Sequence, residues 1–332
     1  MSLEWKILGS VDGDNALFVR INAGQAVQSV LFDCGEGCLS HLEFADVLAL
    51  DHVCFSHFHA DHVAGFDSLL RARLNLEKPL HLWGPTGSIE LITHRLRGIL
   101  WNLMDGLSAP WVVHEIHENV ICTRTFQRLE GFQNFAPDTK EIWHDTILET
   151  TYFQLQARVM DHATPSLTFR LSEPERVNVD TTQFTALGLR PGAWVKAFKD
   201  APIEQAQLEI DGKQYDLETL RSQLLLRSAG ETIAYLTDFL LNEKALLKLE
   251  SMLQAGDMIV CESQYLHSDL ELATRNFHMT SVQAANLATR VKAQELILFH
   301  LSRRYSSDQW QELLLEAQTI FENTSFSSHW KL

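Results

Sequence analysis

The chain has 332 residues, of which 45% are hydrophobic and 21% are charged, a composition typical of a globular protein with a large core. It carries 43 acidic and 27 basic residues, and the resulting net charge of −16 argues against broad, non-specific binding of nucleic acids, which needs a basic face. No apolar run approaches the roughly 18 residues that cross a bilayer, and the first residues have no secretory apolar region, so we expect a cytoplasmic protein with no membrane partner.

The first hundred residues alternate between short strands and helices. The expected strands are 5–10, a hairpin of 15–21 and 29–32 around a turn at 22–24, a buried strand over 47–50 and 53–55, and 80–83; the expected helices are 63–74 and one that starts near residue 88. This order predicts a layered α/β arrangement. Asp33 follows the hairpin, where its carboxylate either caps the turn or orients a metal-bound histidine.

The stretch Ser56-His57-Phe58-His59-Ala60-Asp61-His62-Val63-Ala64-Gly65 places three imidazoles and a carboxylate within six residues. It lies on an expected turn from strand to helix, where His57 and His59 point the same way and Asp61-His62 can face a second ion close by. Neutral imidazole and carboxylate suit Zn²⁺ or a similar divalent ion. A surface turn rich in histidine, with no metal, is the alternative, but this pattern after a buried strand is specific to metal sites.

The rest of the chain continues the strand and helix series around an insertion. The expected elements are a lobe over the site at 100–150, strands at 151–159 and 167–171, an insertion at 173–230 with a hairpin turn at 210–213, strands at 231–236, 258–261 and 295–299, and helices at 281–291 and 308–321. His162, Asp238, Glu262 and His300 each stand at the end of one of these strands, where α/β enzymes carry their site residues. The five cysteines are odd in number and partly in apolar runs, so we expect reduced thiols.

The recurrence of metal-binding side chains at strand ends predicts a centre with two ions. One ion would be held by His57, His59 and His162 and the other by Asp61, His62 and His300, with Asp238 bridging them. Two ions about 3.5 Å apart activate a shared water and clamp both oxygens of an in-line displacement, so the expected reaction is hydrolysis. Zinc is the expected metal, and manganese or iron also accept these ligands.

The sequence resembles the metallo-β-lactamase superfamily and, within it, the ribonuclease Z family of tRNA 3′-processing endonucleases. The resemblance covers nearly the whole chain, and its most specific part, residues 298–305 (Leu-Phe-His-Leu-Ser-Arg-Arg-Tyr), is similar to the family pattern L-T-H-I-S-x-R-Y. It implies a four-layer αββα sandwich formed by a single domain, 1–332, with residues 173–230 as an inserted arm that contacts the substrate. It also implies a homodimer that acts on precursor tRNA.

The resemblance further implies roles outside the metal ligands. His278, paired with Glu262, would protonate the leaving 3′-oxygen of a phosphodiester, and Asp61 would steer the nucleophilic water as well as bind metal. This assignment makes chemical sense because an alkoxide leaving group needs a proton and a carboxylate keeps an imidazole charged near pH 7. From position alone, His278 is equally well a solvent-exposed residue at a helix start.

Departures from the family pattern keep two other readings open. Residues 11–15 (Val-Asp-Gly-Asp-Asn) are acidic where the family has a basic segment, Cys261-Glu262-Ser263-Gln264 replaces H-E-A-T, and the basic run of the arm is reduced to Lys196 and Lys199. These changes spare the chemistry and weaken the expected grip on RNA. A diverged hydrolase of a small phosphodiester or other ester is therefore the alternative function. A non-catalytic metal-binding scaffold is a third, disfavoured because it would not need Glu262 and His278.

Overall fold

The structure, a computed structural model, describes residues 2–23, 26–101, 108–133, 135–202 and 204–330. It has two compact units: unit 1 comprises Met1–Ser172 and Glu231–Leu332, and unit 2 comprises Glu173–Gly230. None of the helices in the described residues combines the length and apolar character that a bilayer crossing requires. All five cysteines are free, as expected from the sequence.

Eight strands form the first sheet of unit 1, in their order along the chain. They are β1 Ser2–Leu8, β2 Ala16–Asn22, β3 Val27–Phe32, β4 His52–Cys54, β5 Leu80–Pro85, β6 Trp111–Ile116, β7 Val120–Phe126 and β8 Thr139–Ile142. Strands β3 to β6 are parallel to one another, so β3 and β4 end at the same edge of the sheet. Asp33 and the histidine cluster follow directly from these two strand ends.

Seven strands form the second sheet, in the order β19-β18-β17-β16-β11-β10-β9. They are β9 Thr146–Glu149, β10 Gln154–Asp161, β11 Pro165–Ser172, β16 Thr232–Leu236, β17 Met258–Glu262, β18 Glu295–Phe299 and β19 Thr324–Phe326. Strands β16, β17 and β18 are parallel, and β10 runs in the same direction because it is antiparallel to β11, which is antiparallel to β16. His162, Asp238, Glu262 and His300 therefore lie at one edge of this sheet.

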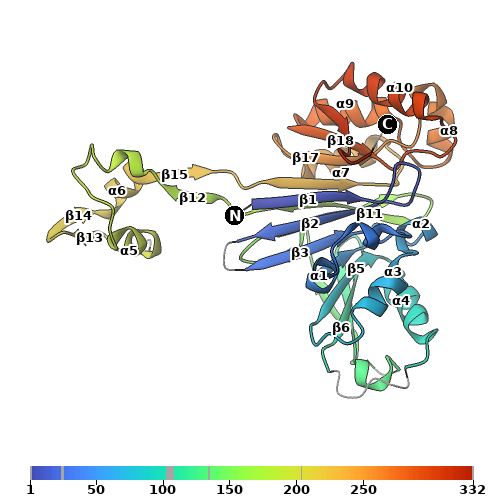
Figure 1. Cartoon of the computed structure of the whole chain (residues 1–332), viewed down its shortest axis with the longest axis horizontal. Coiled ribbons are helices and arrows are strands. Elements are labelled where there is room, and N and C mark those ends of the chain that lie inside the picture. The colour runs from blue at the N-terminus through green and yellow to red at the C-terminus, as the bar shows by residue number, and fades with distance from the viewer. Residues whose placement is uncertain (1, 24–25, 102–107, 134, 203, 331–332) are drawn as a thin grey trace. The chain divides into compact units, whose positions relative to one another are not determined.

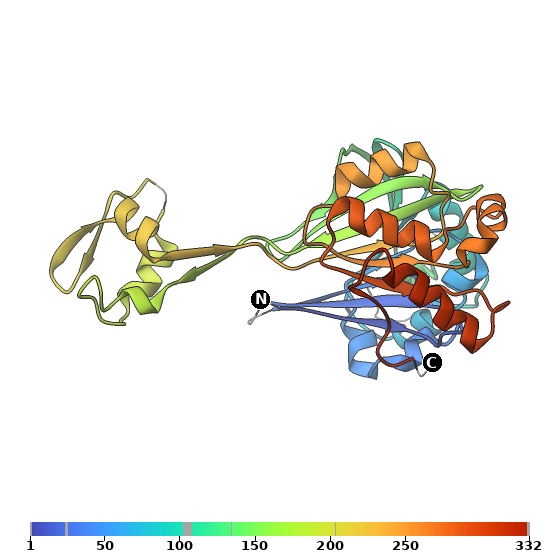
Figure 2. The same ribbon diagram turned by 90° about the horizontal axis from the view of Figure 1, so that it is seen from above.

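Helices cover the outer faces of the two sheets (Figures 1 and 2). They are α1 Phe44–Ala49, α2 Ala60–Val63, α3 Phe66–Ala72 and α4 Ser88–Arg97 beside the first sheet, and α7 Glu243–Met252, α8 Leu270–Arg275, α9 Ser281–Val291 and α10 Ser307–Gln318 beside the second. One core packs the sheets together, for example through Phe32 against Phe169 with ring centroids 5.4 Å apart. A second core lies under α1, α3 and α4. The predicted αββα sandwich is confirmed.

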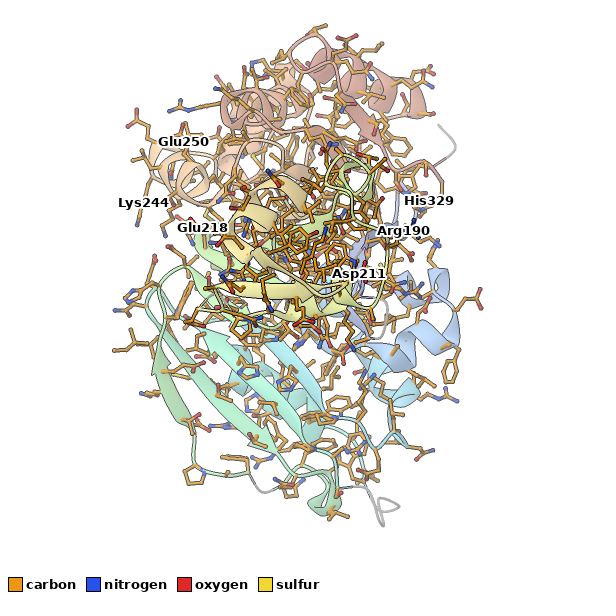
Figure 3. The ribbon with its side chains drawn as sticks, turned by 90° about the vertical axis from the view of Figure 1, so that its left-hand side faces the viewer. Arg190, Asp211, Glu218, Lys244, Glu250 and His329 are labelled. Carbon is orange, nitrogen blue, oxygen red and sulfur yellow. The ribbon has the colours of Figure 1, made fainter. Side chains whose placement is uncertain are left out.

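Unit 2 has a small core of its own. Its elements are β12 Arg176–Val179, α5 Trp194–Asp200, β13 Gln207–Ile210, β14 Lys213–Asp216, α6 Leu217–Leu224 and β15 Leu225–Ser228. Eight buried apolar residues, among them Phe184, Phe198 and Leu217, form that core. The predicted hairpin is present, with Asp211 and Gly212 in the left-handed region at φ 53° and 79°. Arg190, Asp211 and Glu218 are exposed on the surface of this unit (Figure 3).

Two predictions about local structure were wrong. Residues 47–49 belong to α1 and not to a buried strand: within the helix only Val47 is buried, as expected when one face of a short helix packs on the sheet. The described residues between 100 and 150 do not form a separate lobe, because β6, β7 and β8 extend the first sheet and β9 joins the second. Residues 102–107 and 134 of that stretch, and 24 of the turn expected at 22–24, lie outside the described residues.

Candidate metal centre

The histidine cluster leaves the first sheet on a turn between β4 and α2. His59 has extended backbone angles, φ −68° and ψ 155°, and α2 begins at the next residue. The turn packs tightly on the residues after β3, because a Cβ on Gly65 would lie 2.3 Å from the carbonyl oxygen of Gly35, and one on Gly35 would lie 2.5 Å from that of Asp61. Glycine at these two positions therefore allows the ends of β3 and β4 to meet at the site.

The structure brings all seven predicted metal ligands together. His57, His59 and His162 form one group, with ring centroids 4.5 to 5.0 Å apart. Asp61, His62 and His300 form a second group, in which Oδ2 of Asp61 lies 3.5 Å from Nε2 of His62 and 3.4 Å from Nε2 of His300.

Asp238 lies between the two groups. Its Oδ2 atom is 3.7 Å from Nε2 of His57, 3.8 Å from Nε2 of His162 and 3.2 Å from Nε2 of His62. Its Oδ1 atom is 3.5 Å from Nδ1 of His300. A single carboxylate thus faces ligands of both groups, which is the position expected of a bridging ligand.

The donor atoms fit a divalent metal ion. Nε2 of His57 and Nε2 of His62 are buried and make no hydrogen bond of good geometry. Buried polar atoms are normally paired, so two unpaired ring nitrogens that face a buried carboxylate indicate a ligand at this position. Nitrogen and oxygen donors in this number are those that zinc, manganese and iron accept. The fold and these clusters together identify a site for divalent metal.

The other ring nitrogen of each buried histidine has a partner that orients the ring. Nδ1 of His62 lies 2.8 Å from Oδ2 of Asp33, and Nδ1 of His162 lies 2.9 Å from the carbonyl oxygen of Phe277. Nδ1 of His57 lies 3.0 Å from Oγ of Ser56. These contacts hold Nδ1 as the donor and leave Nε2 free to bind metal. The predicted contact between Asp33 and a histidine of the cluster is confirmed.

Sequence reasoning missed several residues that support the ligands. Ser56 and Tyr235 both donate hydrogen bonds to Oδ2 of Asp33, at 2.7 and 2.9 Å. Thr237 donates to Oδ1 of Asp238 at 2.7 Å, and Gln264 lies 3.1 Å from Nδ1 of His300. Thr237 and Gln264 follow the ends of β16 and β17. Their position at strand ends, which identified Asp238 and Glu262, could also have indicated these two residues. Tyr235 lies inside a strand and gave no such signal.

Burial and neighbouring charges shift the pKa values of the site residues in opposite directions. Burial and the nearby His62 hold the pKa of His57 well below its usual value. Burial also disfavours a charged His62, but the carboxylates of Asp238 and Asp33 outweigh it and raise the pKa of His62. For Asp238 the effect of burial is overcome by His300 and His62, so its pKa is lowered and it remains a carboxylate.

His278 and Glu262 form a pair beside the predicted metal ligands. Nδ1 of His278 lies 2.9 Å from Oε2 of the fully buried Glu262, and the His278 ring lies 4.9 Å from that of His162. Burial lowers the pKa of His278, but Glu262 more than compensates and raises it to about 9. The side chain of His278 is only 11% exposed, so this residue is not the solvent-exposed helix residue that its position alone allowed.

Comparison with known proteins places the chain in a family. It is 40% identical to a ribonuclease Z of Deinococcus radiodurans, over 98% of this chain and 97% of that protein, and 28% identical to a ribonuclease Z of Chlamydia caviae, over 92% and 86%. No protein-family model matches the sequence.

Solved structures show the same fold. The metallo-β-lactamase fold protein YhfI of Bacillus subtilis matches 98% of this chain and 95% of its own with a TM-score of 0.57 and 16% identity. The short form of human tRNase Z matches 98% and 96% with a TM-score of 0.54 and 16% identity. With this fold, these ligand groups and a relative 40% identical over nearly its whole length, the chain belongs to the ribonuclease Z family and is a metal-dependent hydrolase of the endoribonuclease type.

Proposed function

We propose that the chain binds two divalent ions, with zinc as the expected metal, and cleaves an RNA phosphodiester at the 3′ end of precursor tRNA. The observation that carries the proposal is the position of Asp238, whose two oxygens lie 3.2 to 3.8 Å from nitrogen atoms of His57, His62, His162 and His300. One residue within reach of both histidine groups suits a centre with two ions and not a single structural ion.

The ligand sets follow from the two groups. His57, His59 and His162 would hold one ion, Asp61, His62 and His300 the other, and Asp238 would contact both. When bound, the ions would lower the pKa of a shared water and draw negative charge from the phosphate oxygens. Manganese or iron in place of zinc would meet the same donor atoms.

Asp61 and His278 supply the proton chemistry in this proposal. The side chain of Asp61 is 47% exposed, and its Oδ2 faces His62 and His300, so its other oxygen is available to orient the attacking water. His278 is held through Nδ1 by Glu262, which leaves Nε2 to donate a proton to the departing 3′-oxygen. Glu262 keeps the ring charged and fixes its orientation.

The tRNA substrate and the role of unit 2 rest on the family. Several relatives are named ribonuclease Z, and a solved structure of the same fold is named tRNase Z. Within a single domain of residues 1–332, we propose that residues 173–230 contact the substrate as an arm, and that the enzyme is a cytoplasmic homodimer. The separate core of unit 2 supports this role, because an arm with a core of its own can keep its shape when it meets RNA.

One observation favours a second candidate, a hydrolase of small phosphodiesters. Asp14, in the acidic segment that replaces the family's basic one, lies 3.2 Å from a guanidinium nitrogen of Arg303, three residues after the ligand His300. This pairing occupies an arginine that would otherwise be available to RNA phosphates.

The deciding experiment compares two substrates after reconstitution with zinc or manganese. Cleavage of a precursor tRNA to a product with a free 3′-hydroxyl, at a kcat/KM far above that for bis-p-nitrophenyl phosphate, supports the proposal. Turnover of the small diester without cleavage of the RNA would replace it with the second candidate. Elemental analysis with fewer than one ion per chain and no turnover of either would refute both.

A further inference from the structure

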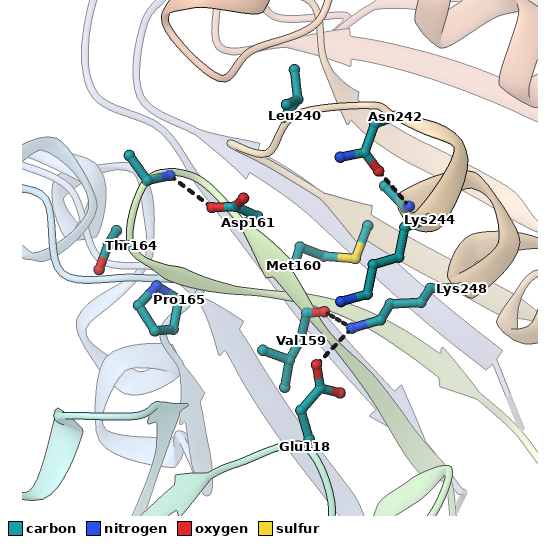
Figure 4. Close-up of a pocket in the computed structure, with 12 residues that line it drawn as sticks. Glu118, Val159, Met160, Asp161, Thr164, Pro165, Leu240, Asn242, Lys244 and Lys248 are labelled. Carbon is teal, nitrogen blue, oxygen red and sulfur yellow. Dashed lines mark hydrogen bonds and ion pairs between the residues drawn. The ribbon is translucent and has the colours of Figure 1, made fainter.

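A cavity of about 370 Å³ lies between the turn after β10 and the start of α7 (Figure 4). Asp161 and Ala163, the neighbours of His162 in the chain, line it, and so does Leu240, two residues after Asp238. The opposite wall is the first half of α7. All of its lining residues belong to unit 1, and none of them is among the residues assigned above to metal or proton chemistry.

The lining combines apolar and polar groups in separate places. Val159, Met160, Pro165 and Leu240 supply an apolar surface. Polar side chains surround this apolar surface. One of them, Asn242, accepts a hydrogen bond at Oδ1 from the backbone N–H of Ala245, and its NH₂ group is available to donate to a ligand.

Two lysines extend from α7 toward β10, and they differ in their partners. Nζ of Lys248 lies 2.9 Å from Glu118 and 2.6 Å from the carbonyl oxygen of Val159, so this lysine is held in place. Lys244, one turn earlier on the same face of the helix, is exposed and has no ion-pair partner among the described residues. Of the two carboxylates in the lining, Glu118 pairs with Lys248 and Asp161 accepts a hydrogen bond from the backbone of Ala163, so Lys244 is available as a contact for an anion.

We propose that this cavity is a subsite for one nucleotide of the RNA strand next to the scissile phosphate. The inference rests on the proposed function and deepens it. The volume falls in the range of about 300 to 1,000 Å³ typical of small-ligand sites. The apolar side chains would contact one face of the base, and Lys244 would contact a phosphate. Because Asp161 and Ala163 of its lining flank the proposed ligand His162, a nucleotide bound there would lie close to the phosphate that is cut.

The test uses the metal-reconstituted full chain and two variants. Lys244→Glu reverses the charge, and Thr164→Trp fills part of the cavity from its half-buried rim. Each should raise KM for precursor tRNA at least fivefold and leave metal content and the kcat/KM for bis-p-nitrophenyl phosphate within twofold of the wild type. Lys244→Arg should restore RNA binding, and Lys244→Glu should reduce the salt dependence of RNA binding by about one phosphate contact. Lys140→Glu, the same change at an exposed position of β8, is the matched control and should alter none of these values.

Two outcomes overturn the subsite. The first is a KM for precursor tRNA equal to that of the wild type in both Lys244→Glu and Thr164→Trp. The second is an increase in KM in Lys140→Glu as large as that in Lys244→Glu, which would show only a general effect of charge. If the wild type does not cleave RNA, the proposed function fails separately. The subsite is then tested with the p-nitrophenyl ester of thymidine 5′-monophosphate: a raised KM in both variants supports it, and unchanged KM refutes it.

Discussion

The hydroxyl of Tyr235, on β16 of the second sheet, donates a hydrogen bond of 2.9 Å to Oδ2 of Asp33, at the end of β3 in the first sheet. The same oxygen accepts from Ser56 and from Nδ1 of the predicted ligand His62, and both Tyr235 and Asp33 are buried. A hydrogen bond between the sheets therefore ends on the carboxylate that orients a predicted metal ligand. Packing of the sandwich and geometry of the metal centre are coupled through this carboxylate.

Tyr235→Phe removes this hydrogen bond and changes little else in the core. We expect the variant to fold and to bind metal about tenfold more weakly, because contacts that orient ligands contribute about 10- to 100-fold to metal affinity. Competition with a chelating dye measures the change. Tyr152→Phe, at a half-buried tyrosine, is the control. Equal metal affinity in Tyr235→Phe and the wild type would show that Asp33 holds His62 without the tyrosine.

His278→Ala should lower kcat by about 10²-fold or more while both ions are retained, which is the usual effect of losing a general acid. Glu262→Gln should cause a smaller loss, because it leaves His278 in place but removes the charge that stabilises its protonated form. Turnover and elemental analysis on the same samples separate the two effects. A His278→Ala variant as active as the wild type would exclude it as the proton donor.

Asp238→Ala should lose metal and not only activity. The carboxylate faces both histidine groups, so its removal weakens each of them at once. Elemental analysis should find fewer than one ion per chain. Added zinc should raise the Tm of the metal-free wild type, because a ligand that binds the folded state stabilises it, and should raise that of the variant much less. Full metal content in Asp238→Ala would contradict the bridging role.

Replacing residues 177–227 by a short Gly-Ser linker tests the arm. Arg176 and Ser228 are paired across β12 and β15, so a short linker can join these two residues directly without moving the backbone on either side of the deletion. We expect turnover of bis-p-nitrophenyl phosphate within about twofold of the wild type and a KM for precursor tRNA at least tenfold higher. Unchanged RNA cleavage would show that unit 2 does not contact the substrate.

Acid should destabilise the fold through His52, the first residue of β4, whose ring packs at a tilt against the rings of His81 and Trp83. Burial, with a contribution from His81, lowers the pKa of His52 to about 4. An unfolded histidine binds its proton near pH 6.5, so the unfolded state takes up an extra proton as the pH falls below about 6.5, and stability decreases until about pH 4.

The variant His52→Gln isolates this contribution, because an amide oxygen can accept the bond that Trp83 donates to His52 and does not titrate in this range. Urea unfolding at pH 6.5 and pH 5 should show that the wild type loses more stability than the variant, by up to about 2 kcal/mol over this interval. Equal losses would mean that His52 takes up its proton over the same pH range in the folded and the unfolded state.

Much of the candidate site was predictable from the sequence because its signals are local. The spacing of His57, His59 and His62 after an apolar run indicates metal ligands without any knowledge of the fold. The helix predicted at 281–291 is present with the same bounds, and Thr280 begins it with a capping box to Gln283. His162, Asp238 and His300 were found because each follows an apolar run that reads as a strand, and parallel strands end at one edge of a sheet.

What the tertiary structure alone decided has a common physical cause. Whether residues 47–50 form a helix or a strand depends on how many of their faces are buried, and a short apolar run does not encode that. The hydrogen bonds of Tyr235 and Gln264, and the cavity beside Lys244, depend on side chains from elements far apart in the chain. A metal ligand is limited to a few residue types, so the sequence reveals it. A supporting partner is any polar group that packing brings within hydrogen-bond distance, and only the folded chain shows which group that is.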